Sequence, residues 1–411
     1  MWEHPLKKSF LTACLGIVVL VAAVLATTPA DAAGNGRHAV RVCAASSKAT
    51  VASCSAKVLV SDKTGKVAAS AAPPAGAMTP TQLRAAYGLT TDASGTVAII
   101  DAYGYPNLER DLGVYRSQFG LPACTRASGC LKILNQSGGT NLPKFNVGWA
   151  GETALDIDAV SAICPGCKIL VVQANSASIA NLGTAAATAA KQPGVVAISN
   201  SYGGGDLSDA TYGSYYNHPG IAVTASTGDN GYQGGSFPAS SSYVVAVGGT
   251  SLTMSGTSRV SETAWSGAGS GCSTVNAALA GAATFGTGCA KRAIADVSAA
   301  ADPGKGGMAV YWPTNSRSST WAQVGGTSES SPIIASVFAL AGGVGAGVTA
   351  NSVLYAHAGS LLDVVSGTNG NCPTTQWCNG RAGWDGPTGL GVPNGLGAFS
   401  TLCSSPGRNR R

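Results

Sequence analysis

The sequence GGTSESSPIIASVFALAGG, at residues 325–343, decides how the rest of the chain can be arranged. Two glycines, a Thr-Ser pair and a proline before an apolar run are typical of a tight loop that leads into the N-terminus of a helix. A serine hydroxyl there lies at the positive end of the helix dipole, where an alkoxide and a tetrahedral oxyanion are both stabilised. Ser328 is therefore a candidate nucleophile. The alternative is that Ser328, Ser330 or Ser331 serves only as the N-cap of the helix.

Five short apolar runs lie upstream of this stretch and are predicted to be strands. They are VAIID (97–101), KILVVQ (168–173), VVAIS (195–199), IAVTAS (221–226) and YVVAVG (243–248). Continuous apolar runs of this length are typical of a parallel sheet whose two faces are covered by helices. We expect helices at residues 151–162, 178–191 and 328–343. The alternation predicts an α/β fold with a mostly parallel central sheet, in which functional groups gather at the carboxyl ends of the strands.

The N-terminal residues have the pattern of an export signal. Two lysines precede an apolar run from Phe10 to Ala26, and Ala-Asp-Ala follows at 30–32. This order predicts a signal peptide over residues 1–32 that is cleaved after Ala32. Because the run nearly reaches the length of a membrane span, an uncleaved anchor is the alternative. No later segment could span a bilayer, so we expect a secreted, extracellular protein with no membrane contact after cleavage, or one associated with the cell envelope.

The cysteines agree with export to an oxidising compartment, because they fall into closely spaced pairs. Apart from Cys14 in the signal, Cys403 is left over. The motif CPGC at 164–167 could instead be a redox site or half of a zinc site. The spacing makes five disulfides plausible: Cys43–Cys54, Cys124–Cys130, Cys164–Cys167, Cys272–Cys289 and Cys372–Cys378.

Composition divides the remaining chain into two parts. Residues 33–77 are polar and rich in Ala, Ser and Lys, and they end in AAPPAGA, which is typical of a linker. We predict a short leader or pro-segment over 33–77 and the main domain over 78–411. The net charge of +6 is small and dispersed, which does not indicate a nucleic-acid partner.

A pair of carboxylates lies in one of the expected helices. Glu152 and Asp156 are four residues apart, so a helix places both on the same face. Like charges at this spacing repel each other unless they share a proton, bind a cation or are solvated. Glu152 is a candidate general base for Ser328, with Asp156 hydrogen-bonded behind it, and a carboxylate can act at a low pH at which a histidine is protonated. The alternative is a solvated acidic face.

Asp229 is a further candidate, in a glycine-flanked loop after an expected strand. A protonated Asp can donate a hydrogen bond to an oxyanion. The alternative is a turn residue, because Asp-Asn-Gly strongly favours turns. A Ser-His-Asp triad would instead use Asp101, at the end of the first strand, and His218, the only histidine inside the expected sheet region.

Taken together, these pieces resemble the sedolisins, the serine-carboxyl peptidases with a subtilisin-like fold. The motifs that carry the resemblance are ETALD at 152–156, STGDNG at 226–231 and GGTSESSP at 325–332, in the family's order. Supporting matches are TPTQLRAAYG at 79–88, AVGGT at 246–250 and DVSA at 296–299. The resemblance covers roughly residues 79–397 and implies a subtilisin-like three-layer fold.

The resemblance also implies a role for each candidate residue. Ser328 is expected to be the nucleophile, Glu152 the base, Asp156 its partner and Asp229 the acid that stabilises the oxyanion. The expected activity is hydrolysis of peptide bonds in protein or peptide substrates at acidic pH, through an acyl-enzyme, by a monomer. The rival hypotheses are a catalytically inactive secreted binding or cell-surface module on a peptidase scaffold, and a neutral subtilisin-like peptidase.

The motifs LDV at 362–364 and RAGWDGPTGLG at 381–391 resemble the family's calcium site, in a C-terminal region at about 360–395. Two carboxylates and backbone carbonyls from glycine-rich turns suit a hard cation that prefers oxygen ligands. Without the resemblance, acids in such turns are ordinary turn residues. The match implies one Ca²⁺ bound by the side chains of Asp363 and Asp385 and the carbonyls of Val364, Arg381 and Gly383.

The sequence departs from the family pattern in three places. Only about 45 residues separate the expected signal from the start of the main domain, where the family has a long folded pro-region. Glu329 follows the candidate nucleophile where a small or apolar residue is usual, and it either raises neighbouring pKa values or points into solvent. Arg381 replaces a usual glycine among the expected calcium ligands.

Overall fold

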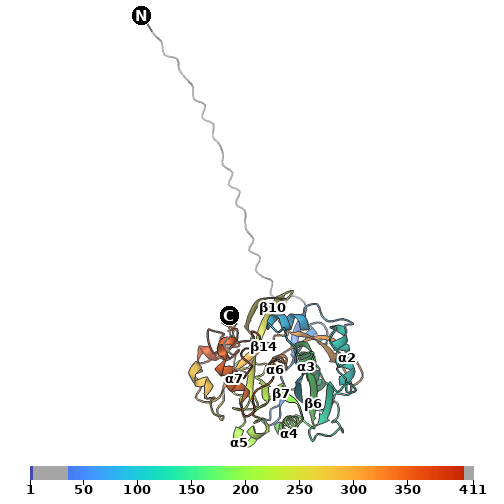
Figure 1. Cartoon of the computed structure of the whole chain (residues 1–411). Helices are drawn as coiled ribbons and strands as arrows, with labels where there is room; N and C mark the ends of the chain where they lie inside the picture. The colour runs from blue at the N-terminus through green and yellow to red at the C-terminus, as the bar shows by residue number, and fades with distance from the viewer. Residues whose placement is uncertain (3–35, 402–411) are drawn as a thin grey trace, which may run out of the picture.

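The protein is described here from a computed structural model, which covers residues 1–2 and 36–401 (Figure 1). The expected signal peptide, apart from its first two residues, lies outside the described residues, and so does Cys403. None of the described helices is both long enough and apolar enough to cross a membrane.

A twisted sheet forms the centre of the molecule, with the strand order β11-β10-β9-β7-β4-β6-β5 and β14 beside β10. All of its pairs are parallel except β10 with β11. The five predicted strands are all present, and β5, β11 and β14 were not predicted. The bounds are β4 (Thr96–Ala102), β5 (Leu131–Asn135), β6 (Lys168–Ala174), β7 (Val195–Asn200), β9 (Ala222–Ser226), β10 (Val245–Ser255), β11 (Ser258–Ala264) and β14 (Val297–Ala300).

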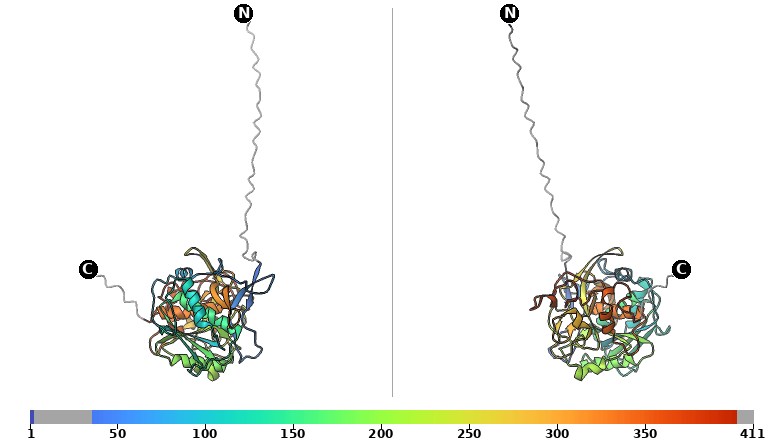
Figure 2. Two further views of the ribbon diagram at one scale, coloured as in Figure 1. Left: turned by 90° about the vertical axis from the view of Figure 1, so that its right-hand side faces the viewer. Right: turned by 60° about the vertical axis from the view of Figure 1, so that its left-hand side comes forward.

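Helices cover both faces of this sheet, as the continuous apolar strands indicated. Helices α3 (Val147–Ile163) and α6 (Thr327–Leu340) lie on one face, and α4 (Ile179–Ala190) lies on the other (Figures 1 and 2). Along β4, Val97 and Ile99 pack toward α3 and α6, while Ala98 and Ile100 pack toward α4. Because side chains alternate along a strand, each face needs its own apolar set, and the result is the predicted three-layer α/β fold.

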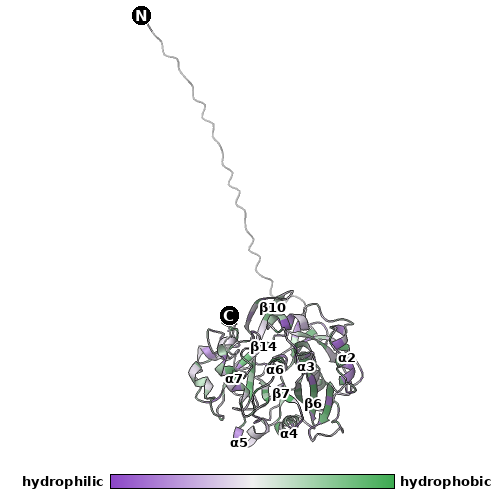
Figure 3. Ribbon diagram, viewed as in Figure 1, coloured by the Kyte–Doolittle hydropathy of each residue, from purple (hydrophilic) through white to green (hydrophobic). Residues whose placement is uncertain are grey.

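The other elements surround these layers. Helix α1 (Pro80–Ala86) begins at a capping box formed by Thr79 and Gln82. Helix α2 (Leu108–Gln118) lies outside the sheet and is largely hydrophilic, in contrast to the apolar central strands (Figure 3). The shorter elements are α5 (Asp209–Tyr212), α7 (Ala350–Ala356), β12 (Gly271–Cys272) and β13 (Ala293–Ile294).

The segment from residue 37 to residue 61, which we call the N-terminal strap, is hydrogen-bonded into the fold. Its strands β1 (Arg37–Arg41) and β3 (Lys57–Ser61) continue a second, antiparallel sheet with β16 (Ser319–Gly325) and β15 (Met308–Pro313). Between them, β2 (Ser53–Cys54) pairs with β8 (Tyr202–Gly203). The blue strands of the strap lie at the edge of the molecule (Figure 2). The division into leader and main domain stays a prediction, but the strap contacts the main domain closely.

The five predicted disulfides are all formed: Cys43–Cys54, Cys124–Cys130, Cys164–Cys167, Cys272–Cys289 and Cys372–Cys378. The sulfur atoms of the CPGC motif are therefore bonded to each other, which leaves no thiolate pair for half of a zinc site.

One buried ion pair connects the sheet to its surroundings. Arg292 and Asp296 are both fully buried, and Arg292 Nη1 donates to Asp296 Oδ1 at 2.8 Å. Asp296 Oδ2 also accepts the Ala246 N–H of β10 at 2.8 Å, and Oδ1 accepts the Tyr355 hydroxyl of α7 at 2.9 Å. In addition to its contact with Arg292, the Asp296 carboxylate thus accepts one hydrogen bond from β10 and one from α7.

We expect Asp296→Ala to lower the free energy of unfolding by about 3–5 kcal/mol, because it leaves the Arg292 charge buried without a partner. Denaturant unfolding at pH 6 measures this. In the matched control, Glu109→Ala, the ion pair to Arg126 is at the surface, so we expect a change of at most about 1 kcal/mol. If the two substitutions lowered the free energy of unfolding equally, the buried pair of Asp296 with Arg292 would not have the stabilising role that we expect.

Candidate active site

Ser328 is the second residue of α6, and the N-cap of this helix is Gly326, which supplies no side-chain hydrogen bond. The interpretation of these serines as N-caps is therefore wrong. The Ser330 hydroxyl donates to the carbonyls of Ala299 and Ala300, and Ser331 bonds within the core. Of these three serines, Ser328 is the one whose hydroxyl lies near the carboxylates described below. Its backbone N–H belongs to the first turn of the helix, where N–H groups have no acceptor within the helix.

Gly326 and Pro332 shape the start of α6. Gly326 has φ 109°, which favours glycine, and a Cβ there would overlap both the Ser55 carbonyl oxygen and Asp229 Oδ2. Pro332 lies inside the helix and has no N–H to donate to the Ser328 carbonyl four residues earlier. The Ser201 hydroxyl approaches that carbonyl instead, at 3.4 Å.

Ser201 connects Ser328 to the carboxylates of α3. The Ser328 hydroxyl donates to the Ser201 carbonyl at 3.1 Å, and the Ser201 hydroxyl donates to Asp156 Oδ1 at 2.7 Å. Ser201 lies directly after β7, at the carboxyl edge of the sheet. The sequence placed it at a strand end but offered no signal for this bridging role.

The carboxylates of Glu152, Asp156 and Asp101 form a buried cluster beside Ser328. All three are fully buried, so the solvated acidic face considered for α3 is wrong. Burial raises the pKa of Glu152 well above its usual range, with Asp156 and Asp101 adding to the rise and the nearby Ser328 hydroxyl opposing it. Burial likewise raises the pKa of Asp156, and that of Asp101 to about 7. Among the described residues, no hydrogen-bond partner reaches either carboxylate oxygen of Glu152.

Asp229 lies at the N-terminus of α6, on the loop after β9. Its Oδ1 accepts the Thr327 N–H at 2.8 Å and the Thr327 hydroxyl at 2.9 Å. Burial raises its pKa to about 6, while the contacts with Thr327 and the charge of Lys57 lower it. No described group bonds to Oδ2, which faces the same space as the Ser55 carbonyl oxygen. Asp229 is thus more than a turn residue.

The structure separates the two residues considered for a histidine triad. Asp101 is the second-last residue of β4, at the carboxyl edge of the parallel sheet, and its carboxylate lies near Glu152. His218 precedes β9 at the opposite edge, and its Nε2 lies 2.9 Å from the Tyr215 carbonyl oxygen. Because parallel strands place these edges a full strand length apart, the Ser-His-Asp hypothesis is wrong.

Glu329 does not point into solvent. Its side chain is fully buried, and burial raises its pKa well above the usual range, opposed by the backbone N–H of Met308 on β15. The side chain therefore lies toward the second sheet.

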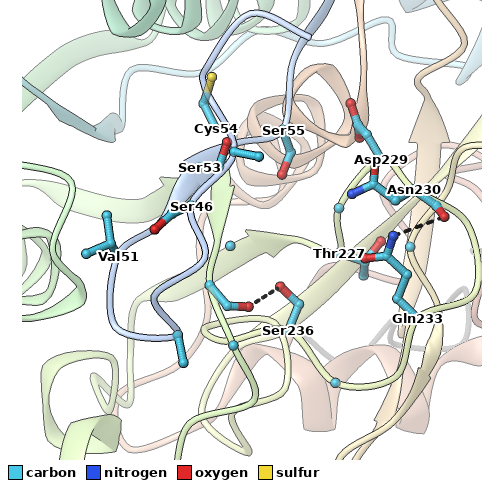
Figure 4. Close-up of a pocket in the computed structure, with 18 of the residues that line it drawn as sticks. Ser46, Val51, Ser53, Cys54, Ser55, Thr227, Asp229, Asn230, Gln233 and Ser236 are labelled. Carbon is cyan, nitrogen blue, oxygen red and sulfur yellow. Dashed lines mark hydrogen bonds between the residues drawn. The ribbon is translucent and has the colours of Figure 1, made fainter.

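A cavity of about 440 Å³ reaches Ser55 and Asp229, whereas Ser328 and the three clustered carboxylates are not among its lining residues. The strap lines one wall, and the loop after β9 lines another (Figure 4). In this view, Ser53 and Ser55 belong to the wall formed by the strap, and Thr227 and Asp229 belong to the wall formed by the loop after β9.

The expected calcium ligands come together in one loop region. Asp363 Oδ2 accepts the Gly383 N–H at 2.8 Å, and Asp385 Oδ2 accepts the Arg381 N–H at 3.0 Å. The Arg381 side chain is directed away, toward Gln376. Val364 is buried beside Asp363.

These donors fit a hard cation in their chemistry. Burial raises the pKa of Asp385 to about 7, and the Asp363 carboxylate adds to the rise, so a cation would relieve their repulsion. In the described part of the chain, no cluster of three or more His, Cys, Asp or Glu side chains could hold a metal. Backbone carbonyls would therefore have to complete the shell.

Comparison with known proteins finds relatives that match the whole main part of this chain or a short part of it. No protein-family model matches the chain. Kumamolisin from Bacillus sp. (strain MN-32) is 30% identical over 379 residues, which cover 82% of this chain and 65% of kumamolisin. Aorsin from Aspergillus oryzae (strain ATCC 42149 / RIB 40) is 43% identical over 76 residues, which cover 17% of this chain and 12% of aorsin. The matches thus span less than two thirds of the length of either relative.

Solved structures with the same fold include Pseudomonas sedolisin, a serine-carboxyl proteinase complexed with two molecules of pseudo-iodotyrostatin. It has a TM-score of 0.63 and 24% identity, over 80% of this chain and 96% of that chain. Sphericase has a TM-score of 0.52 and 15% identity, over 76% of this chain and 96% of that chain. These likenesses confirm the predicted fold.

The buried carboxylates predict that stability falls as the pH rises. The pKa of Asp229 rises from 3.8 to about 6 on folding, so between these values the folded state holds a proton that the unfolded state has lost. In Asp229→Asn, which cannot titrate, the loss of unfolding free energy between pH 4 and pH 7 should be smaller by roughly 3 kcal/mol.

Urea unfolding at a series of pH values measures this difference. The control is Glu109→Gln, at a surface carboxylate whose ion-pair partner is Arg126; because an arginine stays charged from pH 4 to pH 7, this variant should keep the parent's pH dependence. A parent protein that gains stability from pH 4 to pH 7 would rule out protonated burial of Asp229.

Proposed function

The chain belongs to the sedolisin family, and from this premise we propose that it is a serine-carboxyl peptidase that hydrolyses peptide bonds through an acyl-enzyme on Ser328. One observation carries the proposal: the nucleophile, a buried cluster of carboxylates and a separate buried Asp meet at the N-terminus of α6. A serine peptidase needs a base, an oxyanion site and a serine within reach of both. The three motifs of the sequence supply one of these each.

Glu152 is the proposed general base. Its carboxylate has no other hydrogen-bond partner among the described residues, and the Ser328 hydroxyl is near enough to affect its pKa. Rotation of Ser328 away from the Ser201 carbonyl would direct the hydroxyl proton to Glu152 as Oγ attacks. Glu152 then returns the proton to the leaving amine.

Asp156 and Asp101 support this transfer. Asp156 is held by the Ser201 hydroxyl, and its pKa is raised by burial and by Asp101. Three carboxylates in one buried cluster cannot all be ionised, so they share protons over a wide range of pH. One ionised carboxylate in the cluster is sufficient for a base.

Asp229 is the proposed oxyanion acid. In its protonated form, Oδ2–H donates a hydrogen bond, and the Ser328 N–H at the helix N-terminus supplies a second donor. The pKa of Asp229, raised by burial to about 6, keeps this proton in mildly acidic solution. The proposal therefore includes an acidic pH range, with activity lost as the pH rises through that value.

The proposed setting is extracellular, with proteins or peptides as substrates and a monomer as the active form. The five disulfides support an oxidising compartment. We also propose that Asp363 and Asp385, with the carbonyls of Val364, Arg381 and Gly383, hold one Ca²⁺. The ion would supply charge that holds the C-terminal loops together.

Activity is tested with casein at pH 4, after prior incubation of the full chain at the same pH. Ser328→Ala removes the nucleophile and Glu152→Gln removes the base, so each should lower the rate by at least about 1000-fold. Ser117→Ala and Glu109→Gln, on α2 and distant from the site, are the matched controls and should digest at the parent rate. Parent-like digestion by folded Ser328→Ala protein would exclude this mechanism, and the same holds for Glu152→Gln.

Calcium binding predicts a chelator effect on stability. Removal of the ion with EDTA should lower the melting temperature by about 3–4 °C, if the ion is present at roughly 100 times its dissociation constant. Elemental analysis of the purified protein should find one calcium per chain, and Asp385→Asn should lose both the metal and the response. If EDTA leaves the melt of the purified protein unchanged and elemental analysis finds no calcium in it, the proposed site is contradicted.

A further inference from the structure

Glu329 directly follows the proposed nucleophile, and no step of the proposed reaction uses it. Its side chain is fully buried and lies toward β15 of the second sheet. The Met308 N–H of β15 is close to the carboxylate, but no described group completes a hydrogen bond to either of its oxygens. A buried carboxyl group without partners costs a moderate free energy when it is neutral and far more when it is ionised. The position therefore suits a protonated Glu329 and opposes a charged one.

The groups around Glu329 do not favour a negative charge there. Burial raises the pKa of Glu329, and the Asp302 carboxylate, on the loop after β14, adds to the rise. The Tyr115 hydroxyl of α2 has no hydrogen-bond partner in the described chain. Burial raises the pKa of Tyr115, and the carboxylates of Asp158 and Glu329 raise it further. Tyr87, directly after α1, is buried and also lies near the Glu329 carboxylate.

The neighbouring side chains in the first turn of α6 are held by hydrogen bonds to other elements. Asp229 accepts both the N–H and the hydroxyl of Thr327. The Ser330 hydroxyl donates to two carbonyl oxygens of β14, at 3.0 and 2.9 Å. The Ser331 hydroxyl bonds to hydroxyl groups of β7 and β9, both at 2.9 Å. On the side of Glu329, by contrast, the turn is held by burial of a neutral group.

Hydrogen bonds within the helix add little at this turn. Pro332 has no N–H, so the Ser328 carbonyl lacks the donor that a helix normally supplies four residues later. The Glu329 N–H donates to the Gly326 carbonyl at 2.9 Å, which closes a tight turn of the 3₁₀ type. The first turn can therefore move while the rest of α6 stays folded, and such a local opening costs less free energy than unfolding of the protein.

We propose that Glu329, in its protonated form, is a positioning residue for Ser328. The neutral carboxyl group keeps the first turn of α6 in its place toward β15. Loss of its proton releases the turn and moves Ser328 away from Glu152 and Asp229. The inference rests on the proposed peptidase function, and it adds a conformational limit to the chemical limit that Asp229 sets. It also gives a role to the residue at which the sequence departs from the family pattern.

The direction of the pH effect follows from the raised pKa. A released Glu329 has an ordinary pKa of 4.5, whereas the buried side chain keeps its proton at higher pH. The contact is therefore fully stabilising below pH 4.5 and is lost as the pH rises. Asp229, whose pKa burial raises to about 6, loses its proton over part of the same range. Because each required proton contributes one factor, activity should fall by about two powers of ten per pH unit at the high-pH limit.

Hydrogen exchange tests the position of the turn without any catalysis. The purified full chain is compared at pH 5 and pH 7, and the amides of residues 326–332 are followed by mass spectrometry after correction for the intrinsic effect of pH. We expect their protection in the parent to fall by at least about tenfold, since one pKa unit corresponds to a factor of ten. Glu329→Gln, which mimics the protonated form, should keep its protection.

Asp158→Asn is the matched control for this measurement. Asp158 is also a buried acid beside β15, where its Oδ2 accepts the Tyr311 N–H at 3.1 Å, but it lies on α3. This variant should therefore lose protection at α6 as the parent does. If Asp158→Asn kept its protection as Glu329→Gln does, the effect would belong to buried acids in general and the inference would fall.

The pH profile of peptide hydrolysis tests the effect on Ser328. Glu329→Ala, which leaves the space toward β15 unfilled, should lower kcat at pH 4 by about 10- to 100-fold with little change in KM. Glu329→Gln should restore kcat at pH 4 to within about threefold of the parent. Between pH 4 and pH 7, Glu329→Gln should lose at least about tenfold less of its kcat/KM than the parent loses.

The outcomes separate this inference from the proposed function. Loss of protection in the parent that Glu329→Gln lacks supports the role of Glu329, whether or not peptides are hydrolysed. Equal loss in both proteins, or equal pH profiles of kcat/KM, overturns the inference and leaves a Ser328-dependent activity standing. A parent protein that keeps full protection from pH 5 to pH 7 overturns it without any variant. Loss of protection that depends on Glu329, without Ser328-dependent hydrolysis at pH 4, overturns the proposed function alone.

Discussion

The contact between Asp229 and the first residue of α6 is the interaction on which this site depends. Asp229 Oδ1 accepts both the N–H and the hydroxyl of Thr327, so a loop after β9 satisfies the free end of a helix that starts 98 residues later. Gly326 permits the approach because any Cβ would collide with Asp229 and with the strap. This contact positions the Ser328 N–H and hydroxyl relative to the sheet, and everything proposed for the site follows from that position.

The same contact belongs to a region that is unusually rich in buried acids. Glu152, Asp156, Asp101 and Asp229 are all nine-tenths or more buried, and burial is the largest cause of the raised pKa of each. Ionising such groups costs free energy in a folded protein, whereas protonating them does not. A fold that keeps these acids inside is therefore better suited to acidic than to neutral solution, and the protonated Asp229 that stabilises the fold is also the form that could donate to an oxyanion.

The N-terminal strap changes how the site is understood. Composition marked residues 33–77 as a polar leader that ends in a linker, yet β1 and β3 complete a sheet with β15 and β16, and Ser55 contacts Ser328 directly. Pairing of β2 with β8 joins this segment to the chain that directly follows β7 and Ser201. The strap is thus part of the described fold, and it lines part of the cavity that reaches Asp229.

Apolar runs and glycine positions were enough to predict the parallel strands and the helix at Ser328, because these signals are local in sequence. The cysteine pairs were predictable for the same reason. The three short motifs, through the resemblance that they carry, led to the four proposed site residues. Tertiary structure was needed for the rest. Only it could place Asp101 beside Glu152 rather than beside His218, bury Glu329 against β15, and bring the Ser55 carbonyl to the Ser328 N–H across 273 residues. Contacts between segments that are distant in sequence depend on how strands are ordered in a sheet, and a single sequence carries no local pattern for that order.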